Sequence, residues 1–320
     1  MPEDEQVELQ TAAPAQADPT PEALVELKIE PAKPRGIAPV WHTLILVLAI
    51  LAYSFWGAIG AKNGAANPIA PPSGTVHTAA VGADHVRLIR YALTAALELV
   101  IVAWIAFGLR LRKVPFRSLF GRWPRGLNDI TMQILTASAF WVCSMIILLI
   151  CAFSWLFVQN YIYQNETAKQ SAPSSQPSPN AEKPKSPEQQ QSELIHQLTE
   201  LAPANSIEIT AWGMLCLIVG FSEELIFRGY MQSQAIALLR NTPVAVIVTA
   251  VVFGAAHGYQ GVRGIFLISV FGSLFGILTL LRKNLLPGMI AHSWHDFATG
   301  MALALIRSSH LLDHLPKASK

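Results

Sequence analysis

Charged side chains are scarce in this sequence, and their scarcity excludes a water-soluble domain. Only 14% of the 320 residues are Asp, Glu, Lys or Arg, whereas soluble domains carry about 25%. The chain is 52% hydrophobic and has a mean hydropathy of +0.38, and its apolar residues form long runs. These features predict an all-α polytopic membrane protein with about seven to eight transmembrane helices.

Cysteine is rare and a strong charge of either sign is missing. The three cysteines lie inside apolar runs and form no CxxC pair, so neither a disulfide framework nor a cysteine zinc site is expected. A net charge of +2 is too small to indicate a nucleic-acid partner. The HExxH motif of soluble zinc peptidases is absent, and we find no inverted repeat of the kind that transporters carry.

Seven apolar runs divide the chain. A membrane crossing needs ~20 apolar residues, so the fifth run is marginal and the others suffice. In chain order the runs are Val40–Ile59, Leu88–Leu109, Ile130–Val158, Ile207–Leu239, Pro243–Ala256, Ile265–Leu281 and Leu285–Ile306. Gly272 and Gly276 in the sixth run form a small-xxx-small pair, which predicts the close approach of a neighbouring helix.

Polar segments separate and flank these runs. Residues 1–36 are expected to form a disordered acidic tail, and residues 37–158 the N-terminal transmembrane helices. Residues 159–205 are rich in Ser, Pro, Gln and Glu, a composition that predicts a disordered loop. A C-terminal helical core is expected over residues 206–308, and residues 309–320 form a C-terminal tail.

A basic segment after the second run predicts the orientation in the membrane. Six Lys and Arg residues occur between Arg110 and Arg125 without an acidic neighbour, so the positive-inside rule places this loop in the cytoplasm. The N-terminal tail is then cytoplasmic as well. We expect a multi-pass protein of the bacterial inner membrane.

Ionisable residues inside the apolar runs are the most informative feature. A charge at the bilayer centre costs at least ~2.5–3.5 kcal/mol on insertion scales, so such residues usually face a polar cavity and act there. All but the first of them fall in the last four runs. They are Glu98, Glu223, Glu224, Arg228, His257, His292, His295 and Asp296.

The adjacent carboxylates Glu223 and Glu224 should have different roles. On a helix, Glu224 and Arg228 are four residues apart and share a face, whereas Glu223 is turned by about 100°. One carboxylate can therefore pair with Arg228 while the other points into a cavity. A carboxylate kept from water holds its proton more tightly, which suits a general base. By itself, the cluster is equally consistent with an ion pair that only holds helices together.

Histidines follow on the next apolar runs. His257 ends the fifth run among small residues, and alone it would more often be structural. In the seventh run His292 and Asp296 share a helix face at a spacing of four, so Asp296 could orient His292 or help to bind the same ligand. His295 could replace His292, but we prefer His292 because it pairs with Asp296 at helical spacing.

A zinc ion is compatible with these residues, and so is a metal-free mechanism. Two His and one Glu are the protein ligands of many hydrolytic zinc sites, so Glu223, His257 and His292 could hold zinc. Counting 1.5 Å per residue leaves Glu223 and His257 roughly 10 Å apart along the membrane normal. We therefore expect residues 229–241 to tilt or re-enter so that the site can close.

The three motifs occur in a characteristic order. Glu-Glu-x-x-x-Arg, Phe-x-x-x-His and His-x-x-x-Asp follow one another on successive apolar runs. In this order they resemble the CPBP family of intramembrane proteases, which includes the type II CAAX prenyl endopeptidases and the bacterial Abi-type proteins. The resemblance spans residues 212–305. It implies a helical membrane core around a catalytic cavity and the hydrolysis of a peptide bond in a membrane-associated or lipidated substrate.

The resemblance also assigns roles. Glu223 would activate a water molecule with His257 beside it, and Glu224 and Arg228 would be the supporting pair.

His292 and Asp296 would stabilise the tetrahedral oxyanion or complete a metal site. Asp296 stands where eukaryotic prenyl endopeptidases usually carry Asn. An ionised Asp cannot donate a hydrogen bond, so Asp296 must be protonated, orient His292 or bind a metal.

Two other functions remain open at this point. Intramembrane carboxylates and histidines also serve proton- or cation-coupled transporters, although the missing repeat and the motif order argue against one. A non-catalytic membrane scaffold or bacteriocin-immunity protein would not need all of the motif residues. The expected partners are a peptide or protein substrate in the membrane, which could be lipidated, and membrane lipid.

Overall fold

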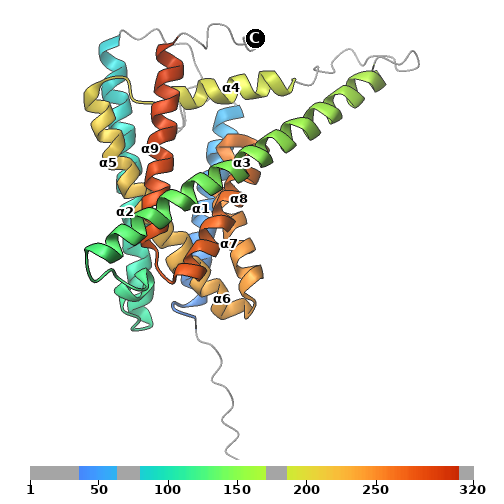
Figure 1. Ribbon diagram of the computed structural model, residues 1–320. Helices are drawn as coiled ribbons and strands as arrows, with labels where there is room; N and C mark the ends of the chain where they lie inside the picture. Colours follow the sequence, from blue (N-terminus) through green and yellow to red (C-terminus); the bar gives the residue numbers. More distant parts are fainter. Residues whose placement is uncertain (1–35, 63–79, 171–185, 310–320) are drawn as a thin grey trace, which may run out of the picture. The chain divides into compact units, whose positions relative to one another are not determined.

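The computed structural model describes residues 36–62, 80–170 and 186–309, and these residues are mainly helical (Figure 1). Both predicted tails lie outside the described residues, except for Gly36 and Ser309. The part that the structure describes contains no strand, and one isolated β-bridge joins Gly121 to Asn284. The helices are α1 (Val40–Lys62), α2 (Ala80–Leu111), the 3-10 helix η2 (Phe116–Phe120), α3 (Leu127–Gln170), α4 (Pro187–Thr199), α5 (Ser206–Glu223), the π-helix η3 (Glu224–Gln232), α6 (Ser233–Leu239), α7 (Thr242–Ala256), the 3-10 helix η4 (Gly258–Gln260), α8 (Gly261–Arg282) and α9 (Leu286–Ser308).

The predicted all-α membrane architecture is confirmed, but the number of clear spans is smaller than expected. Within the described ranges, five segments are long and apolar enough to cross a membrane. Helix α7 is apolar but has only 15 residues, and α9 has 23 residues but carries His292, His295 and Asp296. The five segments are Val40–Ile59, Val86–Leu111, Leu127–Ala168, Ser206–Leu239 and Gly258–Arg282.

The disordered loop predicted over residues 159–205 is largely wrong where the structure describes it. Residues 159–170 continue α3, which crosses the other helices obliquely, and α4 packs against α3 and α9 (Figure 1). Helix α4 begins with a capping box, in which Ser186 and Gln189 each accept a backbone N–H of the other, and Pro187 occupies the first turn. These capping signals outweigh the polar composition on which the prediction rested. Residues 171–185 lie outside the described residues.

Helices α5, η3 and α6 form one helical segment that turns sharply into α7. Arg240 ends it with a left-handed backbone (φ 54°). Asn241 then caps α7 by accepting the N–H of Val244, and Pro243 lies in the first turn. This short connection makes the two arms an antiparallel hairpin, and so the positions of residues along each arm are set by their distance from Arg240.

Glycines let α7 and α8 approach closely, as predicted for Gly272 and Gly276. A Cβ atom on Gly272 would lie 3.3 Å from the Cα atom of Ala250, and one on Gly276 would lie 3.1 Å from Cγ1 of Val246. On α7, Gly254 lies against the backbone carbonyl of Ile265. The two helices therefore pack backbone to backbone.

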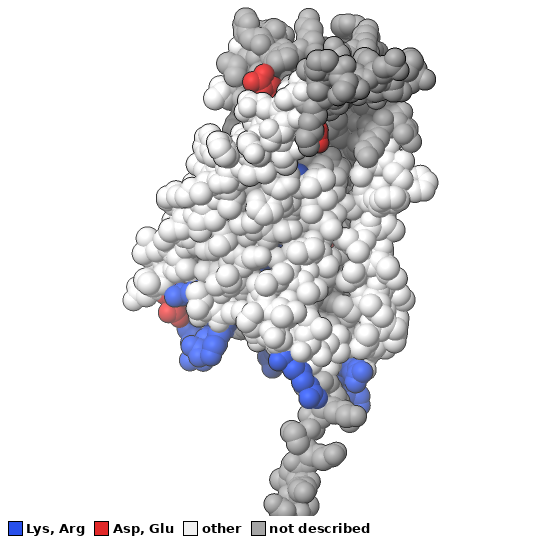
Figure 2. Space-filling model, turned by 90° about the vertical axis from the view of Figure 1, so that its right-hand side faces the viewer, with Lys and Arg blue, Asp and Glu red and all other residues white. Residues whose placement is uncertain are grey.

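Basic residues gather at one end of the described helices (Figure 2). The α2–α3 and α8–α9 connections meet there, because Arg122 donates its backbone N–H to the carbonyl of Lys283 over 3.0 Å. Both connections carry Lys and Arg, as is typical of connections on the cytoplasmic side of a membrane.

Candidate active site

The adjacent glutamates lie where α5 passes into the π-helix η3. Glu223 is the last residue of α5 and Glu224 the first of η3, and π-helical segments occur frequently at functional sites. Oε1 of Glu224 lies 3.0 Å from Nη1 of Arg228, and both side chains are almost fully buried. The two carboxylates thus differ in environment, since Glu223 keeps an exposed fraction of 13%.

Arg228 is fixed from several sides. Its Nη2 donates to the carbonyl of Gly272 over 3.3 Å, and its guanidinium lies over the ring of Phe253 at 4.3 Å. One turn further along, Gln232 donates to the carbonyl of Gly276 over 3.1 Å. The glycine pair of α8 therefore also accepts two side chains from η3, and these bonds hold the Glu224–Arg228 pair in place.

His292 of α9 lies between the two glutamates. Its Nδ1 donates to Oε1 of Glu224 over 2.9 Å, and its Nε2 lies 3.4 Å from Oε2 of Glu223. Oδ2 of Asp296 is 3.8 Å from the same Nε2, too far for a hydrogen bond. Glu224, rather than Asp296, therefore orients the imidazole. The alternative residue, His295, packs its ring against Phe271.

His257 approaches Glu223 from another direction. It ends α7, and its Nδ1 donates to the carbonyl of Phe253 over 3.0 Å. Its Nε2 lies 4.0 Å from Oε1 of Glu223. Ser54 of α1 stabilises this turn, because its hydroxyl donates to Ala255 and accepts the N–H of Gly258. The sequence contained no signal for Ser54, which reaches the site from a helix that is distant along the chain.

The expected gap in depth between Glu223 and His257 is absent. Both residues lie 17 positions from Arg240, and therefore at the same height in the two arms of the hairpin. The gap that motivated a tilt or re-entry of residues 229–241 is closed, because the turn at Arg240 brings the two arms of the hairpin together. The tilt or re-entry itself stays a prediction.

Aromatic rings enclose the imidazole of His292. The rings of Phe253, Phe271 and Phe275 surround it with centroid distances of 6.0, 5.5 and 5.5 Å. An apolar wall of this kind limits access of water and strengthens the electrostatic interactions inside it.

A further carboxylate, Glu98 of α2, belongs to the same surroundings. It interacts electrostatically with Glu223, His292 and Asp296. The sequence marked Glu98 as an ionisable residue within an apolar run, but helical spacing could not relate it to residues more than a hundred positions away.

The zinc hypothesis receives no support from the placement of these side chains. Among the residues that the structure describes, no group of three or more His, Cys, Asp or Glu side chains is arranged to hold a metal ion. We therefore derive no chemical step through a metal. What the cluster offers is a carboxylate flanked by two imidazoles, an arrangement that can accept a proton from water and donate a hydrogen bond to a developing oxyanion.

Residues 205–298 match the family described as type II CAAX prenyl endopeptidase Rce1-like. The matched segment contains all six motif residues, from Glu223 to Asp296, and does not include Glu98. No curated protein and no solved structure gives a significant match. The match supports a CAAX-type intramembrane protease in general terms.

Proposed function

We propose that the chain is a glutamate-type intramembrane endopeptidase, because residues 205–298 match the family described as type II CAAX prenyl endopeptidase Rce1-like. The observation that carries the proposal is the position of Glu223 between two imidazole nitrogens, 4.0 Å from His257 and 3.4 Å from His292. Its substrate is a peptide or protein in the membrane, and the family favours one that carries a lipid next to the cleaved segment.

Glu223 and His257 activate the water molecule. Their facing atoms are too far apart for a direct hydrogen bond, yet close enough for one water to contact both. Because Nδ1 of His257 donates to Phe253, neutral His257 presents the lone pair of Nε2 to this water. As the water oxygen attacks the carbonyl carbon of the substrate, its proton passes to the carboxylate of Glu223.

His292 stabilises the tetrahedral intermediate. Its Nδ1 is committed to Glu224, so the imidazolium form has an Nε2–H free to donate to the oxyanion. Glu223 then gives its proton to the nitrogen of the leaving amine, the carbon–nitrogen bond breaks, and a carboxylic acid and an amine are released. Asp296, with Oδ2 3.8 Å from Nε2, lies next to this donor nitrogen.

The proposed topology follows the distribution of charge. The basic end of the helices (Figure 2) is cytoplasmic by the positive-inside rule. The N-terminus of the chain then lies in the cytoplasm.

The test compares newly formed peptide N-termini in membranes that contain the wild type or Glu223→Gln at equal expression. Glu188→Gln, at an exposed position on α4, is the matched control. We expect cleavage products in the wild type and the control that are missing in Glu223→Gln, and their sequences identify the substrates. Identical profiles for all three proteins, with the variants folded, would contradict proteolysis and favour a transporter or a scaffold.

A further inference from the structure

We propose that Glu98 of α2 binds the substrate peptide by accepting a hydrogen bond from a backbone N–H beside the scissile bond. The inference deepens the proposed function and rests on it, since it adds a binding contact to the same site. Glu98 lies outside the segment that matches the family, so the motif residues do not include it.

The face of α2 on which Glu98 lies is turned toward the interior. Tyr91, Glu98 and Ile105 are separated by seven residues each, a spacing that puts them on one side of a helix. Tyr91 and Ile105 have exposed fractions of 5% and 0%. Glu98 is therefore flanked along the helix by two buried residues.

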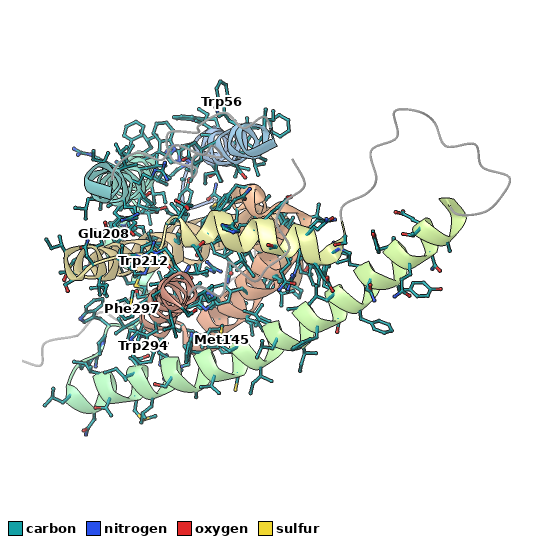
Figure 3. The ribbon with its side chains drawn as sticks, turned by 90° about the horizontal axis from the view of Figure 1, so that it is seen from above. Trp56, Met145, Glu208, Trp212, Trp294 and Phe297 are labelled. Atoms are coloured by element: carbon teal, nitrogen blue, oxygen red, sulfur yellow. The ribbon has the colours of Figure 1, made fainter. Side chains whose placement is uncertain are left out.

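The register between α2 and α5 places Glu98 near the depth of the catalytic glutamate. Nε of Arg87 lies 2.8 Å from Oε2 of Glu208, and the rings of Tyr91 and Trp212 are 5.3 Å apart. Figure 3 shows Glu208 and Trp212 along α5. Within each pair the two residue numbers differ by 121. The same offset places Glu98 level with Val219, four residues before Glu223. Four residues correspond to a rise of about 6 Å.

Helix α9 passes the same level. A Cβ atom on Gly220 would meet the backbone N of Ser293 at 2.8 Å, so this part of α5 touches α9 within one turn of His292 and Asp296. The electrostatic interactions of Glu98 with Glu223, His292 and Asp296 agree with this placement. Glu98 thus lies within about one helical turn of the depth of the reacting groups.

One carboxylate oxygen of Glu98 has nothing to bind. Oε2 is shielded from solvent and has no hydrogen-bond partner in the described part of the chain. An unsatisfied buried acceptor is costly. Oε2 of Glu224 is also without a hydrogen-bond partner among the described residues, but Oε1 of Glu224 already contacts both Arg228 and His292.

The substrate peptide brings hydrogen-bond donors that need an acceptor. A peptide must be extended to be cut, and inside a membrane each of its freed backbone N–H groups requires an acceptor. Glu98 offers a free acceptor oxygen next to the reacting groups. A backbone N–H of the peptide is therefore the donor that this site is built to bind.

The experiment measures KM and kcat with a fluorogenic farnesylated CaaX peptide and a series of analogues, each with one N-methylated backbone amide. Glu98→Ala should raise KM about 5- to 100-fold, the effect of leaving a buried peptide N–H without an acceptor, with kcat changed less. N-methylation of one particular amide should raise the KM of the wild type to a similar extent. The same analogue should not raise the KM of Glu98→Ala further. Glu98→Gln keeps an acceptor oxygen and should restore part of the loss. It also replaces the alanine variant if that variant does not fold.

Val100→Ala is the matched control, because Val100 is 64% exposed on the same helix; it should behave as the wild type. An unchanged KM in both Glu98 variants, or N-methyl effects as large in them as in the wild type, would overturn the inference while leaving the proposed function intact. If the rise in KM in the Glu98 variants instead depends on a Lys side chain in the peptide, the ligand of Glu98 is a cation, and the proposed N–H contact is overturned. A wild type that cleaves none of the peptides, and that also yields no new N-termini in the membrane comparison described above, would overturn both.

Discussion

Oε1 of Glu224 lies 2.9 Å from Nδ1 of His292 and 3.0 Å from Nη1 of Arg228. One buried oxygen thus joins the ion pair of η3 to the imidazole of α9. Because Nδ1 is held by this carboxylate, Nε2 is the nitrogen that faces Glu223. The supporting pair predicted from helical spacing therefore also orients a residue of the site.

Glu224 should have separable effects on stability and activity. Glu224→Leu leaves the Arg228 cation buried without a partner, which we expect to lower the free energy of unfolding by about 3–5 kcal/mol. Glu224→Leu combined with Arg228→Met removes both charges and should recover most of this loss, since apolar replacement of a buried pair is often neutral. Activity should stay low in both variants, because Nδ1 of His292 loses its acceptor. Unfolding in mixed detergent and peptide cleavage measure the two effects. A double variant with wild-type activity would contradict the orienting role of Glu224.

The two histidines of α9 should differ sharply. His292→Ala removes the proposed oxyanion donor and should lower kcat by about 10²–10³. His295→Ala removes a ring that packs on Phe271 and should leave kcat within a few-fold of the wild type. Cleavage rates at saturating peptide give kcat for the two variants and the wild type. Equal losses in the two variants would show that the helix, and not His292 itself, is responsible.

The close contact between α7 and α8 should tolerate no added methyl group. In Gly254→Ala the new Cβ atom would press on the backbone carbonyl of Ile265, so the helices must separate. We expect a loss of about 1–3 kcal/mol in the free energy of unfolding, as for other overpacked cores. Activity should fall as well, since His257 lies three residues further on. Gly126→Ala is the control, because nothing lies within 4 Å of a Cβ atom there.

Chelation should not inactivate the enzyme. The proposed steps use Glu223, His257 and His292 without a metal ion. Dialysis against a strong chelator, followed by removal of the chelator, should therefore leave the cleavage rate unchanged. Loss of activity that returns when zinc is added would contradict the glutamate-type mechanism and restore the zinc hypothesis.

Much of the fold and of the motif set could be predicted from the sequence, because these features are local. The scarcity of charge and the long apolar runs predicted an all-α membrane protein, and the spacing of Gly272 and Gly276 predicted the close approach of a neighbouring helix. The pairing of Glu224 with Arg228 also followed from a separation of four residues on one helix. Composition misled over residues 186–199, where the capping box of Ser186 and Gln189 starts a helix.

The relations between helices were decided only by the tertiary structure. Helical periodicity indicates which residues share a face, but not how a helix is rotated, at which depth it lies, or which helix it meets. The turn at Arg240 brings Glu223 and His257 to the same height, the rotation of α9 gives Nδ1 of His292 to Glu224 rather than Asp296, and the register of α2 on α5 places Glu98 beside the site. The sequence alone determined which chemical groups are available, whereas packing determined which of them meet, because contacts across a helix bundle depend on rotation and register together.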